Sequence, residues 1–136
     1  MNGSNWLIMD THIWIWWVKQ DSQLPAEIEK QLTEHPGALA ICSVSVYEAI
    51  LQIRRGRVTI DLPLEEWLLA ATAEADIAVL NVNVEIAAKA AALSLHHGDP
   101  LDRLILASAI HHDALLASVD SKFLAYEALS GRLISG

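Results

Sequence analysis

Residues 5–10 read Asn5-Trp6-Leu7-Ile8-Met9-Asp10, a short apolar run that stops at a carboxylate. The run has the length of a strand rather than of a helix, and its apolar side chains do not alternate with polar ones. A strand that is buried on both faces of a parallel sheet has this pattern. This stretch therefore predicts a buried strand with an acidic side chain at its carboxyl end.

Similar short apolar runs follow along the chain, separated by segments with helical spacing. The predicted strands are residues 5–9, 38–42, 77–80 and 114–117, with a weak last strand at 132–134. The predicted helices are residues 13–19, 25–34, 46–55, 64–75 and 84–95, a helix that opens at Asp99-Pro100, and a short one at 120–129. Buried strands that alternate with helices form a parallel sheet through right-handed crossovers. The sequence thus predicts an α/β fold, a three-layer α/β/α domain with about five strands.

Length and composition place the chain among ordinary globular proteins. It has 136 residues, of which 53% are apolar and 19% charged, so we predict a single domain spanning residues 1–136. The longest apolar run, Ile13 to Val18, is far shorter than the ~20 residues that a membrane span needs. No basic segment precedes the first apolar run, and Cys42 is the only cysteine. These features predict a cytoplasmic protein without a signal peptide, a membrane contact or an internal disulfide.

The net charge of −8 argues against a protein that coats nucleic acid with a basic face. It does not exclude an enzyme that meets phosphate through bound cations, because a metal ion brings positive charge of its own. The location of the acids decides between these cases. Five carboxylates stand at or near the predicted strand-to-helix junctions: Asp10, Glu48, Asp99, Asp102 and Asp120. In a doubly wound sheet such junctions open at one edge, where ligands bind.

Each of these acids, taken alone, has a simple structural explanation as part of a helix start. Asp10, Asp99 and Asp120 are suitable N-caps, and Asp102 would lie near the positive end of a helix dipole. Ser45 and Glu48 have the spacing of a capping box, in which the Glu48 side chain reaches back to the Ser45 amide.

The five acids together favour a metal site. Five carboxylates at one edge raise each other's pKa values unless a cation neutralises them. They are five of 17 acidic residues and account for more than half of the net charge. Oxygen ligands of this kind suit Mg²⁺ or Mn²⁺, and the usual chemistry of such a cluster is phosphodiester hydrolysis by metal-activated water.

At these residues the chain resembles the PIN-domain family, and more narrowly the VapC-type toxin ribonucleases of type II toxin–antitoxin systems. The similar segments are residues 7–13, 43–50, 96–103 and 118–120, of which Asp99-Pro100-Leu101-Asp102-Arg103 is the most specific. The resemblance implies a parallel sheet of strand order 3-2-1-4-5 and an endoribonuclease that depends on Mg²⁺ or Mn²⁺. It also implies a cognate antitoxin protein that blocks the acidic cleft.

The resemblance assigns roles to individual positions. Asp10, Glu48, Asp102 and Asp120 would form the catalytic, metal-binding set, with Asp99 as an additional acid that either orients metal-bound water or closes the helix. Thr11 would hold the Asp10 carboxylate or a metal-bound water. Arg103, beside the acids, is a candidate to bind substrate phosphate or to tether a catalytic acid. The chain departs from the family at Leu101, where an aromatic residue is usual, and we expect this to affect packing.

The predicted helix at 13–19 is apolar on every side between Ile13 and Val18, which is more than one core-facing stripe requires. Part of this surface therefore predicts a contact with a partner, either the antitoxin or a second copy in a homodimer.

Two other functions are compatible with acids at strand ends. A signalling receiver module also places acids and Mg²⁺ there, but it resembles a pattern with an acidic pair after the first strand and a phosphoacceptor Asp after the third. In this chain Asp10 is followed by Thr11, and the third predicted strand runs into Asn81. The other alternative is a binding module of PIN shape that has lost catalysis, against which the complete set of acids argues.

Overall fold

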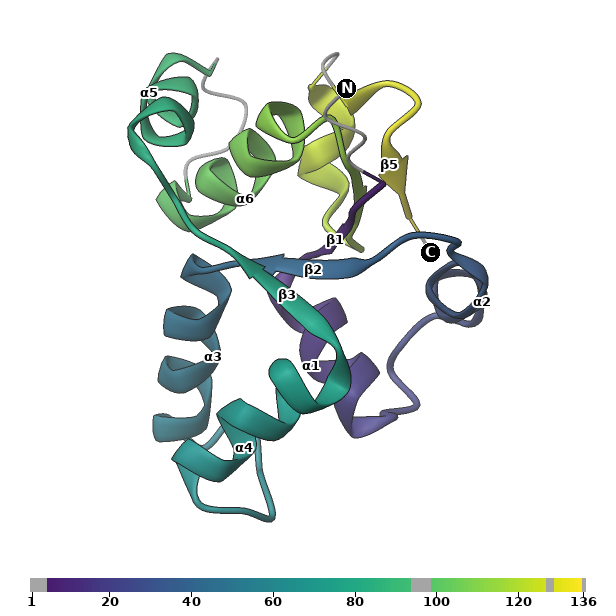
Figure 1. Ribbon diagram of the computed structural model, residues 1–136, viewed down its shortest axis with the longest axis vertical. Helices are drawn as coiled ribbons and strands as arrows, with labels where there is room; N and C mark the ends of the chain where they lie inside the picture. The colour runs from purple at the N-terminus through teal and green to yellow at the C-terminus, as the bar shows by residue number, and fades with distance from the viewer. Residues whose placement is uncertain (1–4, 94–98, 127–128, 136) are drawn as a thin grey trace.

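The computed structural model describes residues 5–93, 99–126 and 129–135 of the chain (Figure 1). The strands are β1 (Leu7–Met9), β2 (Leu39–Cys42), β3 (Ile77–Leu80), β4 (Leu115–Ala117) and β5 (Leu133–Ile134). The helices are α1 (Thr11–Lys19), α2 (Ala26–Glu34), α3 (Val44–Arg54), α4 (Leu64–Ala71), α5 (Val84–Ala92) and α6 (Pro100–His111), with the 3₁₀ helices η1 (Ala73–Ala75) and η2 (Ser121–Ala125).

The five strands form one sheet in the order β3-β2-β1-β4-β5, and every neighbouring pair is parallel. The predicted fold class and strand order are therefore confirmed. In the central strand, Met9 pairs with Ile41 of β2 on one side and with Ala117 of β4 on the other. Because these strands run in the same direction and in this register, the residues that follow each of them meet at one edge of the sheet.

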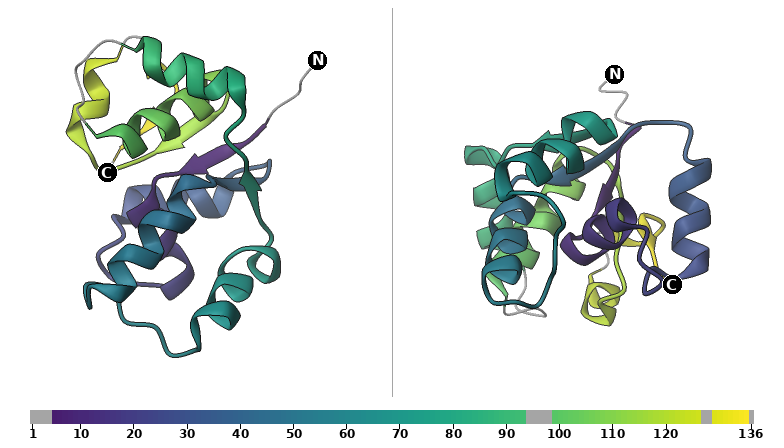
Figure 2. Two further views of the ribbon diagram at one scale, coloured as in Figure 1. Left: turned by 90° about the vertical axis from the view of Figure 1, so that its left-hand side faces the viewer. Right: turned by 90° about the horizontal axis from the view of Figure 1, so that it is seen from below.

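The sheet is covered on both faces, as Figures 1 and 2 show: α5 and α6 lie on one side, and α1, α3 and α4 lie on the other. Leu7 and Met9 of β1 point into the core with α1, α2 and α4, while Ile8 points into the core with α6 and η2. All three side chains of β1 are fully buried, so the first strand of the chain lies at the centre of the domain. This is the burial that an unbroken apolar strand predicts.

The first core is organised around Trp14 of α1. Its indole Nε1 donates to the carbonyl of Ala71 at 2.8 Å, and its ring centroid lies 5.5 Å from that of Trp67 in α4. The predicted core role of the α1 apolar run thus holds for Ile13, Trp14 and Ile15, which are buried, whereas Trp16, Trp17 and Val18 are half-buried. Within the described ranges, every helix is too short or too polar to cross a bilayer.

Several predicted helix bounds need correction. Helix α1 begins at Thr11 and α3 at Val44, each two residues earlier than predicted. The predicted helix at 64–75 breaks at Thr72, whose hydroxyl donates to the Leu68 carbonyl, and continues as η1. The segment after Asp120 forms the 3₁₀ helix η2 instead of a longer helix. The predicted helix at 84–95 is too long, because α5 ends at Ala92 and Leu93 has an extended conformation; residues 94 and 95 lie outside the described residues.

Candidate catalytic and metal-binding site

Four of the predicted acids line one cavity of about 370 Å³, together with His12, Trp16 and Val119. We call this cavity the acidic cleft; its carboxylates belong to Asp10, Glu48, Asp102 and Asp120. Asp10 directly follows β1, Asp120 follows β4, Glu48 is on α3, and Asp102 is in the first turn of α6. Parallel strands and the crossovers between them therefore collect carboxylates from across the chain at one edge of the sheet.

The Asp10 carboxylate is held by two hydrogen bonds. The Ser118 hydroxyl donates to Oδ2 at 2.7 Å, and the Thr11 backbone N–H donates to Oδ1 at 2.7 Å. Burial raises the pKa of Asp10 above its ordinary value, the two hydrogen bonds lower it, and the Glu48 charge raises it. Asp10 thus caps α1 and faces the cleft at the same time, so the two explanations of this residue are not exclusive.

Glu48 is fixed by Thr11 and forms no capping box. The Thr11 hydroxyl donates to Oε1 of Glu48 at 2.5 Å, and its oxygen lies 2.9 Å from Oγ of the buried Ser45. The predicted capping box is wrong because the N-cap of α3 is Ser43, which places both Ser45 and Glu48 inside the helix. The Thr11 hydroxyl therefore orients Glu48, whereas the backbone N–H of Thr11 holds Asp10.

The pKa of Asp102 reflects both the burial and the negative charge of the cleft. The pKa of Asp102 is raised from its ordinary value of 3.8 to about 8, mainly by burial and further by the negative charges of Asp10, Asp99, Glu48 and Asp120. Like charges that cannot separate favour protonation, and a bound cation relieves the same repulsion. Burial and the charges of the four neighbouring acids thus act on Asp102 in the same direction.

Asp99 and Asp120 are both helix caps, but they differ in position. Oδ1 of Asp99 accepts from the Leu101 N–H at 2.9 Å at the start of α6, and its exposed side chain does not line the acidic cleft. Oδ1 of Asp120 accepts from the Lys122 N–H at 2.9 Å, and this residue does line the cleft. Of the two roles predicted for Asp99, the structure displays the helix-closing one.

Arg103 points toward the end of a neighbouring helix. Its Nη2 atom donates to the carbonyl of Ala90 at 2.8 Å and to that of Leu93 at 2.7 Å. These carbonyls lie at the carboxyl end of α5, where a cation also interacts favourably with the helix dipole. The two bonds join α6 to α5, and a contact of Arg103 with phosphate or with a catalytic acid stays a prediction.

Known proteins share both the sequence pattern and the fold. The model of the PIN domain family matches residues 7–129, which contain the whole acidic cleft. The chain belongs to the PIN-domain family. It is 30% identical over 117 residues to Ribonuclease VapC22 of Mycobacterium tuberculosis (strain ATCC 25618 / H37Rv), an alignment that covers 85% of this chain and 88% of that protein.

Two solved structures show the same fold as this PIN domain. A chain of the toxin-antitoxin complex from Klebsiella pneumoniae superposes with a TM-score of 0.67 at 18% identity, covering 95% of this chain and 96% of that chain. A chain of VapBC2 from Rickettsia felis, bound to a DNA fragment from the promoter, superposes with a TM-score of 0.68 at 17% identity, covering 96% of this chain and 98% of that chain.

The donor set of this PIN domain fits a hard divalent cation. Carboxylate oxygens are the ligands that Mg²⁺ and Mn²⁺ prefer, and such an ion would neutralise the negative charges that, after burial, raise the pKa of Asp102. Among the residues that the structure describes, no three Asp, Glu, His or Cys side chains are grouped tightly enough to form a ready coordination shell. Mutual repulsion of carboxylates is consistent with this spacing.

Three contributors to the PIN-domain site were missed from the sequence. The Ser118 hydroxyl donates to Asp10, the Ser45 hydroxyl contacts that of Thr11, and His12 lines the cleft with Asp10. A serine two residues before the acid at the end of the predicted strand was the available signal for Ser118. Ser45 carried no such signal, because its partner Thr11 is 34 positions away in the chain.

Proposed function

We propose that this PIN domain is a metal-dependent endoribonuclease that hydrolyses RNA phosphodiester bonds and acts as the toxin of a toxin–antitoxin system. The observation that carries this proposal is the convergence of Asp10, Glu48, Asp102 and Asp120 on one cleft. The similarity to Ribonuclease VapC22 supports RNA as the substrate. A receiver module is excluded, because receivers have the flavodoxin-like strand order 2-1-3-4-5, which differs from the order of this sheet.

The four cleft acids would hold Mg²⁺ or Mn²⁺. When bound, such an ion supplies a water of lowered pKa and stabilises negative charge on phosphate oxygens. Ser118 and the Thr11 amide hold Asp10 in place and favour its charged form, and the Thr11 hydroxyl orients Glu48. A cation bound in the cleft would favour the ionised form of Asp102, since the negative charge around this residue helps to raise its pKa. Asp99 and Arg103 would act indirectly, by fixing the start of α6 and its contact with α5.

The partner in this proposal is an antitoxin protein, as in the two toxin–antitoxin structures that share the fold. The half-buried Trp17 and Val18 of α1 line a cavity of about 630 Å³ that also contains the polar side chains of Gln20, Glu29 and Thr33. Such a cavity would accept an amphipathic segment of the partner. We also propose a homodimer, whose interface would cover the exposed Leu62 and Leu69. The proposed location is the cytoplasm, where RNA is available. Light scattering of the isolated chain tests the dimer.

The decisive experiment is cleavage of single-stranded RNA in Mg²⁺ or Mn²⁺ by the native chain and by Asp10→Asn. We expect the native chain to cleave RNA, chelator to stop it, and Asp10→Asn to lose activity by about a hundredfold. Asp76→Asn is the matched control, because Asp76 is exposed and has a left-handed φ of 58° that asparagine tolerates. Cleavage that persists in chelator and in Asp10→Asn would refute the mechanism.

Two further measurements separate a nuclease from an inactive binding module. Mn²⁺ should raise the melting temperature of the native chain and of Asp76→Asn, and it should raise that of Asp10→Asn less. Expression in cells should arrest growth for the native chain and not for Asp10→Asn. Metal stabilisation without any RNA cleavage would favour a PIN-shaped module that binds metal and lacks catalysis.

A further inference from the structure

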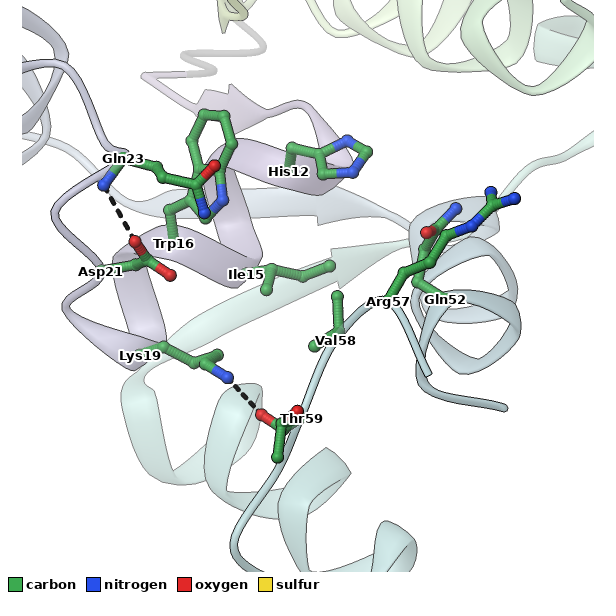
Figure 3. Close-up of a pocket in the computed structure, with 10 residues that line it drawn as sticks. All are labelled: His12, Ile15, Trp16, Lys19, Asp21, Gln23, Gln52, Arg57, Val58 and Thr59. Carbon is green, nitrogen blue, oxygen red and sulfur yellow. Dashed lines mark hydrogen bonds between the residues drawn. The ribbon is translucent and has the colours of Figure 1, made fainter. Parts of the chain in front are cut away.

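A second cavity of about 620 Å³ adjoins the acidic cleft (Figure 3). It lies between α1 and the connection that follows α3, and we call it the side pocket; its lining includes His12, Ile15, Trp16, Gln52, Arg57 and Val58. His12 and Trp16 line both the side pocket and the acidic cleft. A ligand that fills the side pocket therefore lies beside the proposed reaction centre.

The wall formed by the connection is held in place by backbone contacts. Gly56 adopts a left-handed φ of 73°, which turns the chain back so that the N–H groups of Arg57 and Val58 both reach the Gln52 carbonyl, at 2.9 and 3.3 Å. Nζ of Lys19 donates to the carbonyl of Thr59, which ties this wall to α1. The side pocket is thus a feature of two elements that are fixed to one another.

The side pocket combines flat apolar surfaces with donors. The rings of His12 and Trp16 lie with their centroids 5.8 Å apart and tilted by 49°, and Ile15 and Val58 lie between the aromatic side and the Arg57 side in Figure 3. Gln52 and Arg57 lie together on that second side. Within the part of the chain that the structure describes, the Arg57 guanidinium has no hydrogen bond or ion pair, and its side chain is exposed.

The charge of this region differs from that of the rest of the molecule. The chain has a net charge of −8 and only nine Lys and Arg residues, yet two of these, Lys19 and Arg57, line the side pocket against one carboxylate, that of Asp21. Phosphates next to an acidic cleft need local cations to approach it. An aromatic face with a nearby guanidinium and amide is the combination that proteins use for single-stranded RNA, through base stacking and hydrogen bonds to base edges.

We propose that the side pocket binds a nucleotide of single-stranded RNA that flanks the cleaved phosphate, with its base against Trp16 and its phosphate near Arg57. This inference rests on the proposed ribonuclease function and adds to it the residues that hold the substrate. The volume of about 620 Å³ is in the range of pockets that accept small organic ligands, and a nucleotide unit is of that size.

The kinetic test compares Arg57→Gln, Trp16→Leu and Trp16→Phe with the native chain on a short fluorogenic RNA. Arg54→Gln is the matched control, since Arg54 is an exposed arginine at the end of α3 that does not line the side pocket. We expect KM to rise about fivefold in Arg57→Gln, with a weaker salt dependence, and about tenfold in Trp16→Leu. Trp16→Phe keeps an aromatic face and should raise KM less than Trp16→Leu does. Arg54→Gln should keep the native KM and kcat, and melting curves confirm that each variant folds.

A second readout does not depend on cleavage. RNA that carries 4-thiouridine should crosslink, in Asp10→Asn protein, to peptides that contain Trp16 or Arg57. If Arg57→Gln and Trp16→Leu both cleave RNA with the native KM, and the crosslinks fall only on peptides without Trp16 or Arg57, this inference is wrong. The ribonuclease function would then still stand. If the variants keep their RNA kinetics and lose only inhibition by a co-expressed antitoxin, the pocket is a protein-docking site and the inference is wrong. A native chain that neither cleaves nor crosslinks RNA would overturn the function and the inference together.

Discussion

The Ser118 hydroxyl donates to Oδ2 of Asp10 at 2.7 Å, although 108 positions separate the two residues. The contact exists because β1 and β4 are neighbours and Met9 pairs with Ala117, so that the next residue of each strand reaches the same edge. The same Ser118 oxygen accepts the Asp120 N–H at 3.0 Å. One small buried side chain therefore positions two of the four cleft acids.

Ser118→Ala should raise the pKa of Asp10, because the hydrogen bond from Ser118 favours the charged carboxylate. The acidic limb of the pH–activity profile should then move to higher pH. The lost bond should cost about 1–3 kcal/mol of unfolding free energy where Asp10 is ionised and less in acid, where it is protonated. Ser108→Ala is the control, since Ser108 is equally buried but bonds only the Cys42 sulfur, at 3.3 Å. Identical pH profiles for Ser118→Ala and Ser108→Ala would contradict this role.

Thr11→Val should lower kcat/KM for RNA by about tenfold, because it frees Glu48 while keeping the backbone N–H that holds Asp10. Thr11→Ser keeps the hydroxyl and should restore most of the activity. The measurement is cleavage across a Mn²⁺ titration, in which the valine variant should need more metal to reach half of its maximal rate. Equal activity of the valine and serine variants would show that the contact between Thr11 and Glu48 has no functional role.

Metal-free protein should lose stability as the pH rises from about 4 to about 8, through the titration of Asp102. In this interval the folded state binds more protons than the unfolded state, because the pKa of Asp102 is raised from 3.8 to about 8 on folding. Raising the pH therefore favours the unfolded state. Asp102→Asn removes this penalty. Above about pH 8 in chelator, the variant should be more stable than the native chain by about 1 kcal/mol, a value reduced because Asp102 is partly exposed to solvent. Near pH 4 the two proteins should be equally stable.

Melting curves at both ends of this pH range check the Asp102 prediction. A gain of about 1 kcal/mol corresponds to about 4 °C in Tm for a domain of this size. Asp76→Asn should show no such dependence, since Asp76 is exposed and outside the cleft. An Asp102→Asn chain that is less stable than the native one in chelator above pH 8 would refute the electrostatic account.

Arg103→Lys should lower the unfolding free energy by about 1–2 kcal/mol, because a lysine ammonium does not reproduce the guanidinium contacts with the Ala90 and Leu93 carbonyls. Arg55→Lys, an exposed arginine after α3, should leave the melting temperature unchanged. A large rise in KM for RNA without a loss of stability in Arg103→Lys would instead support the substrate-binding role predicted from its place in the sequence.

The elements of this fold could be predicted because their signals are local. Leu7-Ile8-Met9 is apolar throughout, and an unbroken run of this length suits only a strand covered on both faces. Helix bounds were less predictable where one hydroxyl decided them, as at Thr72, whose bond to the Leu68 carbonyl ends α4. The acids at the strand ends were visible for the same local reason, since each stands next to a recognisable run.

The sequence by itself determined the alternation of strands and helices, the burial of β1 and the five acids at or near the strand-to-helix junctions, because these follow from the order of apolar and acidic residues along short stretches. Which four of the acids share one cleft was decided by the tertiary structure. Only the tertiary structure decided that Ser118 holds Asp10, that Thr11 holds Glu48, that Arg103 turns to α5, and that Trp16 and Arg57 share a pocket. These contacts depend on which strands and helices become neighbours. Which strands and helices become neighbours is set by packing across the whole chain, and a local sequence pattern does not predict it.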